Sequence, residues 1–522
     1  MKAPLTILVF LMVGIPSLLL LLGGGDIQRE QLTVRDLGDA TSGWINDVEA
    51  FGGGDGESSP ATVSIGDNVY VAFARFDGGT GFFAVTVIES TDGGAAWSQV
   101  GDFSPGSRDC AYPAMTAYNG QLYVAFQYNV SDTDHDIYCY VSSAGGVGPW
   151  TGFAVRTDTN DDLRPSIASV SNVNYPGVYV VFENRLGGAD GTDLVMYRST
   201  GGAFTFLSTV AGSGDGGEFT APDAAVYDDQ ISPSIYVAFE RLAGSQRDIY
   251  FVLSLNGGTT WSSLYQATSN MNDEYAPSIS ADFTYALISY VMWDGNPDVY
   301  VTAWNGASFI VPEAISNTPD IEGPPEAYNW LDDFYVVYSK GSGDSNGNIY
   351  MAFAQGSLSP SWGYPFLVSD TGAAADTDYR PGLALCERPD GSSYFAVVWS
   401  DFRAGAGTPD IFYSTEGCRC TVNTYPAGYT YSVDGVEYST EQTFNWPAGF
   451  QHTLVASAEG FFYWHDGTNL WTNPSLDLVA STVDIQSLTA YYTAIPEFPT
   501  AALPAIVLSV MVLLLWKRRG TS

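Results

Sequence analysis

A short pattern of residues repeats seven times between Pro60 and Gly417, and this repeat constrains the fold more than any other feature of the chain. Each copy holds an acidic or turn residue, a proline, an apolar stretch, a strand rich in Tyr, Val and Phe, a Gly/Asp loop and a strand that begins with Asp-Ile-Tyr or a similar tripeptide. The copies begin at Pro60, Pro113, Pro165, Pro222, Pro277, Pro325 and Pro381. A period of about fifty residues made of short strands is typical of a β-propeller with one four-stranded sheet, or blade, per repeat. The sequence therefore predicts an all-β chain whose main body is a seven-bladed β-propeller.

The seventh copy has no clear fourth strand before Cys418, whereas a β-like stretch, residues 31–36, precedes the first copy. A ring of sheets closes so that no free strand edge is left to pair with other chains. We therefore expect the strand near 31–36 to complete the last blade, which gives a propeller domain over residues 26–417.

The repeat ends after Cys420. Residues 418–493 contain short alternating strands with turns such as Asp434-Gly435. This pattern indicates a small β-sandwich. Its expected role is that of a stalk between the propeller and the C-terminal segment.

Both ends of the chain are apolar. Residues 1–25 contain an early lysine and a long apolar run, which predicts a signal peptide or signal anchor. Residues 501–516 are uncharged and apolar, and the basic tail Lys517-Arg518-Arg519 follows at once. The pattern predicts hydrophobic helices at both termini, with a transmembrane helix over 501–516. The basic cluster places the C-terminus in the cytoplasm and the rest of the chain at the cell surface.

The chain is strongly acidic, with 58 Asp and Glu against 19 Lys and Arg and a net charge of −39. Such a surface repels nucleic acid and is compatible with a soluble surface protein. It also attracts cations. Loops rich in Asp, Asn and Gly supply the oxygen ligands that Ca²⁺ takes, and the candidate metal ligands are Asp132, Asp134 and Asp136. Solvated loops are the alternative interpretation.

Two turns share a spaced motif. Residues 90–97 read Ser-Thr-Asp-Gly-Gly-Ala-Ala-Trp, and residues 254–261 repeat the spacing with Asn in place of Asp. The side chain of the Asp or Asn accepts backbone hydrogens across the turn, and Gly supplies positive φ. The motif resembles the Asp-box, or BNR repeat, of sialidase-like propellers, which implies a structural role for its residues. These are Ser90, Asp92, Gly94, Trp97, Ser254, Asn256, Gly258 and Trp261.

The C-terminal segment carries a second resemblance. Pro496, Glu497 and Phe498 stand directly before the apolar stretch and its basic tail, within residues 494–522. This order resembles the archaeal PEF-type sorting signal. The resemblance implies an archaeal surface protein whose tail is processed by an archaeosortase-like membrane enzyme.

Acids and arginines recur at two places in the repeat. One set of acids lies shortly before the inner-strand prolines, and it comprises Asp109, Asp161, Asp162, Glu218, Glu274, Glu322 and Asp378. A second set follows the second strand of each copy. The candidate catalytic acids are Asp162, Glu183, Glu240, Asp294 and Asp401, and the candidate ligand-binding residues are Arg164, Arg185, Arg241, Arg380 and Arg403.

The arginines are compatible with a sialidase-type enzyme or with a ligand-binding protein. Sialidases clamp a carboxylate with an arginine cluster, but this chain lacks the Phe/Tyr-Arg-Ile-Pro motif that supplies the first of those arginines. A binding function needs fewer special residues, so the sequence favours non-catalytic recognition of an extracellular glycan or protein. A glycoside hydrolase of sialidase-like fold and a structural envelope protein are the alternatives.

Overall fold

The computed structural model describes residues 44–492 with short gaps. The gaps are residues 46, 54–55, 107, 187–190, 229–232, 283–284, 331–332, 344–345, 355–361, 364, 371, 388–392, 404–407, 448–450, 459–460, 467–468 and 480–486. Among the described residues the secondary structure is β-strand except for one 3-10 turn, η1 (Ser213–Asp215). The prediction of an all-β chain is confirmed.

The first four copies of the repeat form four-stranded antiparallel sheets in chain order. The first sheet holds β2 (Glu57–Ile65), β3 (Asn68–Asp77), β4 (Phe82–Ser90) and β5 (Ser98–Phe103). The second holds β6 (Cys110–Tyr118), β7 (Gln121–Ser131), β8 (Asp134–Val141) and β9 (Thr151–Arg156). The third holds β10 (Asp161–Val170), β11 (Gly177–Arg185), β12 (Thr192–Ser199) and β13 (Thr205–Ala211). The fourth holds β14 (Glu218–Tyr227), β15 (Ser234–Ala243), β16 (Gln246–Ser254) and β17 (Tyr265–Gln266).

The last three copies follow the same plan with two variations. The fifth sheet holds β18 (Asp273–Ala281), β19 (Ala286–Trp293), β20 (Pro297–Trp304) and β21 (Glu313–Ser316). The sixth has its first strand in two pieces and holds β22 (Ile321–Glu322), β23 (Glu326–Trp330), β24 (Asp333–Gly341), β25 (Asn348–Ala354) and β26 (Phe366–Leu367). The last holds β27 (Gly382–Glu387), β28 (Ser393–Asp401), β29 (Asp410–Thr415) and, out of chain order, β1 (Val48–Phe51).

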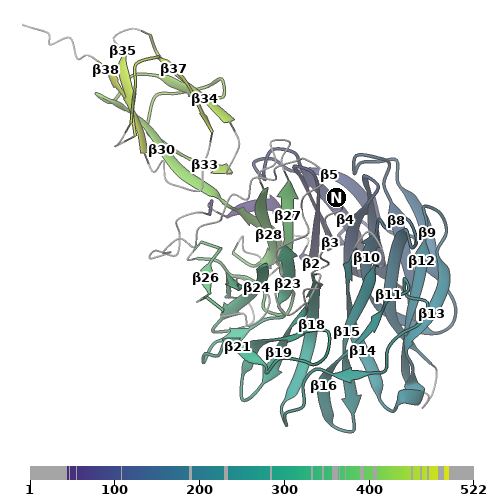
Figure 1. Ribbon diagram of the computed structural model, residues 1–522. Coiled ribbons are helices and arrows are strands. Elements are labelled where there is room, and N and C mark those ends of the chain that lie inside the picture. The colour runs from purple at the N-terminus through teal and green to yellow at the C-terminus, as the bar shows by residue number, and fades with distance from the viewer. Residues whose placement is uncertain are drawn as a thin grey trace, which may run out of the picture. The chain divides into compact units, whose positions relative to one another are not determined.

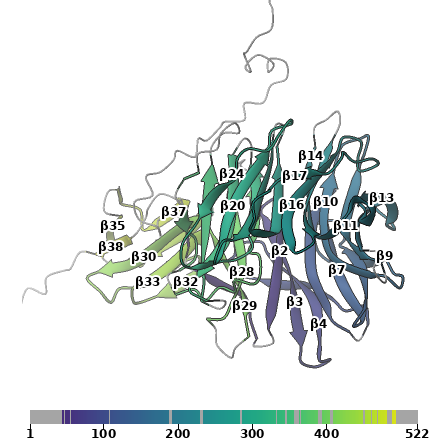
Figure 2. The same ribbon diagram turned by 90° about the horizontal axis from the view of Figure 1, so that it is seen from below.

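The first strands of these sheets contact one another in a closed circuit. β2 contacts β6, β6 contacts β10, β10 contacts β14 and β14 contacts β18. The contacts continue from β18 to β23, from β23 to β27 and from β27 back to β2. We call these the inner strands; the sheets stand side by side around them (Figures 1 and 2). A closed ring of antiparallel sheets is a β-propeller, so the prediction of a propeller is confirmed.

In the first five blades the inner strand bulges directly before its proline. The residue before the proline has positive φ, namely Ser59 (54°), Tyr112 (49°), Arg164 (48°), Ala221 (48°) and Ala276 (52°). The pairing register shifts at each of these positions. Proline has no N–H to donate to a ladder, and a bulge removes it from the regular pairing. The repeated proline therefore marks a repeated kink beside the ring centre.

The space between neighbouring blades is filled by their central strands. One cluster joins Val178, Val180 and Phe182 of β11 to Tyr123 and Ala125 of β7, all of them buried. Strands with both faces buried are continuously apolar, which explains the Tyr/Val/Phe-rich second strand of each repeat. Burial between the blades is therefore the main source of the propeller's stability.

A strand from the N-terminal side completes the last blade. β1 pairs antiparallel with β29. Before it, Trp44 forms a bridge with Glu416, and the N–H of Ile45 donates to the carbonyl of Thr415 at 3.0 Å. The closing strand thus lies at 48–51. The segment 31–36, to which the sequence analysis assigned this role, lies outside the described residues.

A partly buried cation holds the closing segment. Arg403 Nη1 lies 2.6 Å from Asp47 Oδ2, and Arg403 Nη2 lies 2.6 Å from Asp401 Oδ2. Both carboxylate side chains are fully buried. Burial raises the pKa of Asp47 to about 6, although the charge of Arg403 opposes this shift. One guanidinium therefore joins the segment before β1 to the end of β28.

Two turns between third and fourth strands have their own hydrogen-bond networks. Ser90 Oγ donates to Asp92 Oδ1 at 2.9 Å and accepts the N–H of Gly94 at 2.8 Å. The N–H of Ala96 donates to Asp92 Oδ1 at 2.9 Å. In the fourth blade Asn256 Oδ1 accepts the N–H of Thr260 at 3.0 Å. Asn replaces Asp here because both supply the same acceptor oxygen.

Turns of this kind also reach back to the preceding blade. The hydroxyl of Tyr413, in the last blade, donates to the carbonyl of Gly93 at 3.1 Å. Tyr70, in the first blade, donates to the carbonyl of Gly145 in the second at 3.0 Å. Trp261 Nε1, in the fourth blade, donates to Ser208 Oγ of the third at 2.9 Å. These turns therefore connect three pairs of neighbouring blades.

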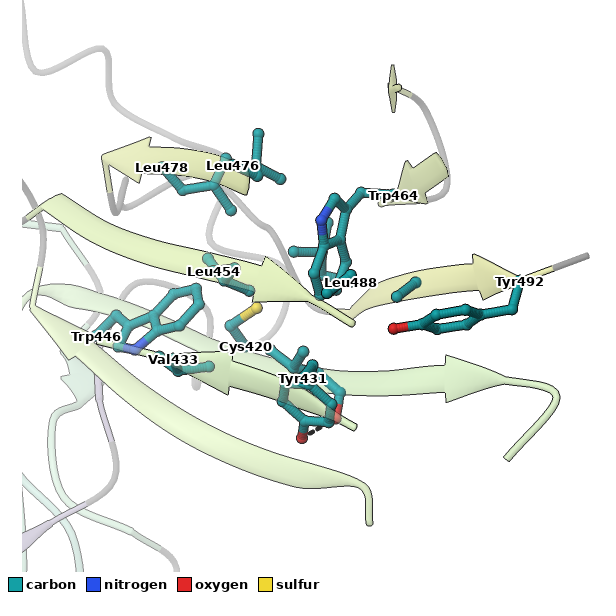
Figure 3. Close-up of a cluster of buried hydrophobic side chains, with 13 residues drawn as sticks. Cys420, Tyr431, Val433, Trp446, Leu454, Trp464, Leu476, Leu478, Leu488 and Tyr492 are labelled. Carbon is teal, nitrogen blue, oxygen red and sulfur yellow. Dashed lines mark hydrogen bonds between the residues drawn. The ribbon is translucent and has the colours of Figure 1, made fainter. Parts of the chain in front are cut away.

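Residues 417–492 form two further sheets around a separate core. One sheet has the order β33-β30-β38-β35-β36, and the other has the order β32-β31-β34-β37. The strands of the first are β30 (Gly417–Tyr425), β33 (Gln442–Pro447), β35 (Phe461–His465), β36 (Leu470–Trp471) and β38 (Ser487–Tyr492). Those of the second are β31 (Tyr431–Val433), β32 (Val436–Tyr438), β34 (Gln451–Ala456) and β37 (Ser475–Val479). Trp446, Leu454, Trp464 and Leu488 pack between the sheets, which makes this domain a β-sandwich (Figure 3).

The predicted terminal helices, residues 1–25 and 501–516, lie outside the described residues. Within residues 44–492, no helix is long and apolar enough to cross a membrane.

The closing ion pair gives a testable prediction. Arg403→Met leaves Asp47 and Asp401 buried without a cation, which should lower the free energy of unfolding by about 3 kcal/mol at pH 7. The loss should be smaller at pH 5, because Asp47 is then protonated. Urea unfolding of the full chain at the two pH values measures both effects.

The matched control is Arg75→Met, at the partly exposed pair in which Arg75 Nη2 lies 2.9 Å from Asp102 Oδ2. Its cost should stay near or below about 1 kcal/mol. Equal costs for the two variants would show that Arg403 has no special role in closure.

Candidate functional site

A cavity of about 740 Å³ lies among the inner strands and is lined by residues from every copy of the repeat. Its charged residues are Arg164, Arg185, Arg247, Arg380, Glu218, Asp223, Glu240, Glu326 and Asp378. Its aromatic residues are Tyr112, Tyr275 and Tyr379. A cavity of this size suits a small ligand or one residue of a polymer.

The bulges bring their own residues to this cavity. Ser59, Tyr112, Arg164, Ala221 and Ala276, the residues with positive φ, all belong to its lining. A residue in this conformation costs about 1 kcal/mol or more for a side chain other than Gly, and it persists only where its surroundings hold it.

Side chains of the preceding blade hold three of these bulges. The N–H of Arg164 donates to Gln127 Oε1 at 3.3 Å, the N–H of Ala221 donates to Glu183 Oε1 at 2.8 Å, and the N–H of Ala276 donates to Glu240 Oε1 at 2.8 Å. Gln127, Glu183 and Glu240 occupy equivalent positions on β7, β11 and β15. These side chains near the end of the second strand therefore stabilise the next blade.

Glu183 is also the acid that two cavity arginines share. Arg164 Nη1 lies 3.2 Å from Glu183 Oε1, and Arg185 Nη2 lies 3.3 Å from Oε2. The carboxylate is fully buried, while the two arginine side chains are 43% and 44% exposed. Burial raises the pKa of Glu183, and Arg164 is the strongest opposing influence. Both guanidinium groups therefore keep part of their surface open to a ligand.

The other two cavity arginines are paired as well. Arg247 Nε lies 3.2 Å from Glu240 Oε2. Arg380 Nη1 lies 3.3 Å from Glu326 Oε2 and 3.6 Å from Asp223 Oδ2. Burial raises the pKa of Glu326 to about 7, against the opposing charge of Arg380. Glu326 is thus partly protonated near neutral pH.

The structure places three of the predicted catalytic acids outside this cavity. Asp162 is buried within its blade, where Asn184 Nδ2 donates to it at 2.8 Å and burial raises its pKa to about 7. Asp294 is exposed in the turn between β19 and β20. Asp401 is held by Arg403 at the closing segment. Of the five candidates, Glu240 lines the cavity and Glu183 contacts two arginines that do.

Two predicted ligand-binding arginines are also elsewhere. Arg241 Nη2 donates to the carbonyls of Asp215 and Gly216 at 2.9 and 2.7 Å, and its Nη1 donates to the hydroxyl of Tyr250 at 2.9 Å. Arg403 joins Asp47 to Asp401. Arg241 and Arg403 therefore bind backbone carbonyls or carboxylates within the fold. Of the predicted arginines, Arg164, Arg185 and Arg380 line the cavity.

The proposed metal ligands do not assemble. Asp132 is exposed in the loop before β8, and Asp136 is buried with its pKa raised to about 6 by burial and by the carboxylate of Asp134. Across the described part of the chain, no group of three or more His, Cys, Asp and Glu side chains is arranged to hold a metal ion.

Sequence reasoning missed Arg247, Asp223, Glu326 and the three cavity tyrosines. Tyr112 stands directly before its proline, as Arg164 and Arg380 do, so the position in the repeat was a usable signal. Arg247 carries no such signal. It reaches the cavity because β15 and β16 pair with Leu242 opposite Arg247.

Several acids before the inner-strand prolines have a different role. Asp248 on β16 neighbours Glu274 on β18, and Asp298 on β20 neighbours Glu322 on β22. Burial is the largest cause that raises the pKa of Glu274 to about 8 and that of Glu322 to about 7, and the neighbouring aspartate adds to each shift. Two carboxyl groups so close share a proton at neutral pH. These acids therefore join neighbouring blades.

Comparisons with known proteins do not assign the chain to a family. No family model matches the chain, and no curated protein matches it. Among solved structures, a protein of unknown function from Dyadobacter fermentans is 15% identical, with a TM-score of 0.42 over 60% of this chain and 97% of its own. A polysaccharide lyase of family PL25, an ulvan lyase, is 11% identical, with a TM-score of 0.44 over 70% of this chain and 95% of its own. An α-L-arabinanase from Penicillium chrysogenum is 11% identical, with a TM-score of 0.41 over 71% of this chain and 98% of its own.

The shared protons give a prediction for pH dependence. The folded state binds a proton at Glu274 up to a pH of about 8, whereas an exposed glutamate loses it near 4.5. This contribution to stability is complete below pH 4.5 and is lost as the pH rises towards 8. We expect the free energy of unfolding to fall by about 2 kcal/mol between pH 5 and pH 8.5, measured by urea unfolding.

Glu274→Gln keeps the shape and donates a hydrogen bond without a proton equilibrium. It should therefore reduce this dependence by the part that Glu274 contributes, while Asp162, Glu322 and Glu326 maintain the rest. Glu313→Gln, at an exposed site on β21, should leave it unchanged. An unaltered pH dependence in Glu274→Gln would mean that the Asp248–Glu274 pair does not share a proton.

Proposed function

We propose that the chain is a cell-surface protein whose seven-bladed propeller binds a glycan in its central cavity without chemically altering it. The observation that carries the proposal is the cavity lining, in which partly open arginines and tyrosines lie among carboxylates, and three of these, Asp223, Glu240 and Glu326, already accept hydrogen bonds. Sugar hydroxyls hydrogen-bond to guanidinium and carboxylate groups, and the apolar face of a sugar ring packs on a tyrosine.

The pairing of the acids favours binding over catalysis. Glu240 accepts hydrogen bonds from Thr220 Oγ1 at 3.0 Å and from the N–H of Ala276 at 2.8 Å. Asp223 accepts from Ser166 Oγ at 2.9 Å and from the N–H of Ile279 at 2.8 Å. A carboxylate that already accepts these hydrogen bonds keeps the bulges in place and orients the arginines.

A side pocket supports a ligand longer than one sugar. It has a volume of about 430 Å³ and shares Tyr275, Pro324 and Asp378 with the central cavity. Its lining includes Trp293, which is 52% exposed. A sugar chain that enters the cavity would continue over this indole.

Export and anchoring complete the proposal. The apolar segments 1–25 and 501–516 would export the chain and hold it in the membrane, and the sandwich would serve as the stalk. The PEF motif at 496–498 would direct processing of the tail in an archaeal cell. Labelling of intact cells with an impermeant reagent tests this location.

One observation favours an enzyme as the second candidate. Glu326 lies in the cavity with its pKa raised to about 7, which is the property of a general acid. In that case the chain would be a glycoside hydrolase, and Glu326→Gln would abolish release of reducing ends from a glycan panel. A structural envelope protein would neither bind nor cleave the panel.

The binding proposal predicts the effect of one substitution. Tyr112 is 43% exposed, lines the cavity and has its ring 5.9 Å from the guanidinium carbon of Arg164. Tyr112→Ala should weaken binding of the full chain to its best ligand on a glycan array by about tenfold, because a central aromatic contact is lost.

Phe206→Ala is the matched control, since Phe206 on the outer strand β13 is 54% exposed and distant from the lining. Binding that is unchanged in Tyr112→Ala, or absent from the whole array, would contradict the proposal.

A further inference from the structure

Three tyrosines lie in one row across the larger sheet of the sandwich. β30 and β38 are parallel with Tyr425 opposite Tyr491, and β38 and β35 are antiparallel with Tyr463 opposite Tyr491. Residues opposite one another in adjacent strands project to the same face. Their chain neighbours Ala490 and Trp464 are buried in the core, so the row lies on the outer face (Figure 3 shows the core side).

The rings of this row are in contact and accessible. The ring centroids of Tyr425 and Tyr491 are 5.7 Å apart, and those of Tyr491 and Tyr463 are 4.8 Å apart with nearly parallel planes at 27°. A bulge in β35 adds Phe462, whose ring lies 5.0 Å from that of Tyr463. Tyr425 is 64% exposed and Phe462 is 59% exposed. We call these four residues the aromatic row.

A polar row runs beside the aromatic row on the same face. Asn423 pairs with Thr489, and Thr489 pairs with His465. Each of the three lies two residues from a tyrosine on the same strand, so their side chains project from the same face. Neither row contains an acid, a lysine or an arginine, although the chain carries a net charge of −39. The two rows therefore offer ring surfaces and polar side chains in parallel lines, and beside them the Glu441 carboxylate accepts a hydrogen bond from Asn423 Nδ2 at 3.1 Å.

We propose that the aromatic row binds an uncharged polysaccharide chain. The C–H faces of successive sugar rings pack on Tyr425, Tyr491 and Tyr463, and their hydroxyl groups reach Asn423, Thr489 and His465. Adjacent strands are about 4.8 Å apart, so a row across three strands is about 10 Å long and exceeds one sugar. The negative charge of the protein disfavours an anionic polymer.

This site is independent of the propeller cavity. A tyrosine ladder also stabilises a sheet through cross-strand pairs, but such pairs need no exposure. An exposed aromatic cluster of this kind costs solubility unless a partner covers it. The sandwich would therefore hold glycan in addition to separating the propeller from its anchor.

Affinity gel electrophoresis of the full chain tests the proposal, with hydroxyethylcellulose, galactomannan or soluble starch in separate gels and polygalacturonate as the anionic probe. We expect retardation in at least one neutral gel. The double substitution Tyr425→Ala/Tyr463→Ala should raise the dissociation constant by about tenfold or more. Tyr425→Phe should retain binding, because the ring remains.

Val479→Ala is the matched control, since Val479 is 59% exposed on β37 of the other sheet. Near-ultraviolet circular dichroism checks that the double variant stays folded; if it does not, Phe462→Ser replaces it.

Retardation in none of the neutral gels, or only in polygalacturonate, overturns the proposal. Retardation that survives the loss of the row but disappears in Tyr112→Ala also overturns it and assigns that ligand to the propeller. Concentration-dependent dimerisation lost in the double variant, without glycan binding, would show that a second copy covers the row.

Discussion

The bulge before the inner-strand proline of the first five blades determines much of what the centre of the propeller presents. Proline removes a donor from the ladder, and the strand responds by placing the preceding residue at positive φ beside the axis. A side chain of the previous blade then holds the exposed N–H, as Glu183 does for Ala221. The same bulge therefore connects neighbouring blades and places the residue before the proline in the cavity lining.

Because side chains of one blade hold the backbone of the next, many of the chain's acids are used for structure and are not free to contact a ligand in the cavity. Glu183 and Glu240 hold bulges and orient arginines, Glu274 shares a proton with Asp248, and Asp401 fixes the closing segment through Arg403. Each function follows from burial, which makes an unpaired carboxylate costly. The surface charge and the interior carboxylates therefore have separate physical causes.

The repeat allowed the propeller, the inner strands and the sandwich to be predicted, because prolines, turn residues and strand alternation are local signals. The same signal placed Arg164 and Arg380 at the cavity, and it would have placed Tyr112 there too. Arg247 was missed because the register between β15 and β16, which brings it to the cavity, cannot be predicted from either strand alone. The strand that pairs with β29, Val48–Phe51, was not predicted, since so short a strand has little pattern of its own.

The turns that reach back to the preceding blade have an evolutionary consequence. Tyr413 fits against Gly93 and Gly94, where a Cβ on Gly94 would lie 2.0 Å from the tyrosine ring. Tyr70 stands in the same relation to Gly146. A single repeat transplanted from another ring would arrive without its matching neighbour. Blades of this protein are therefore expected to be inherited in adjacent pairs, and recombination within a blade should be tolerated better than exchange at its borders.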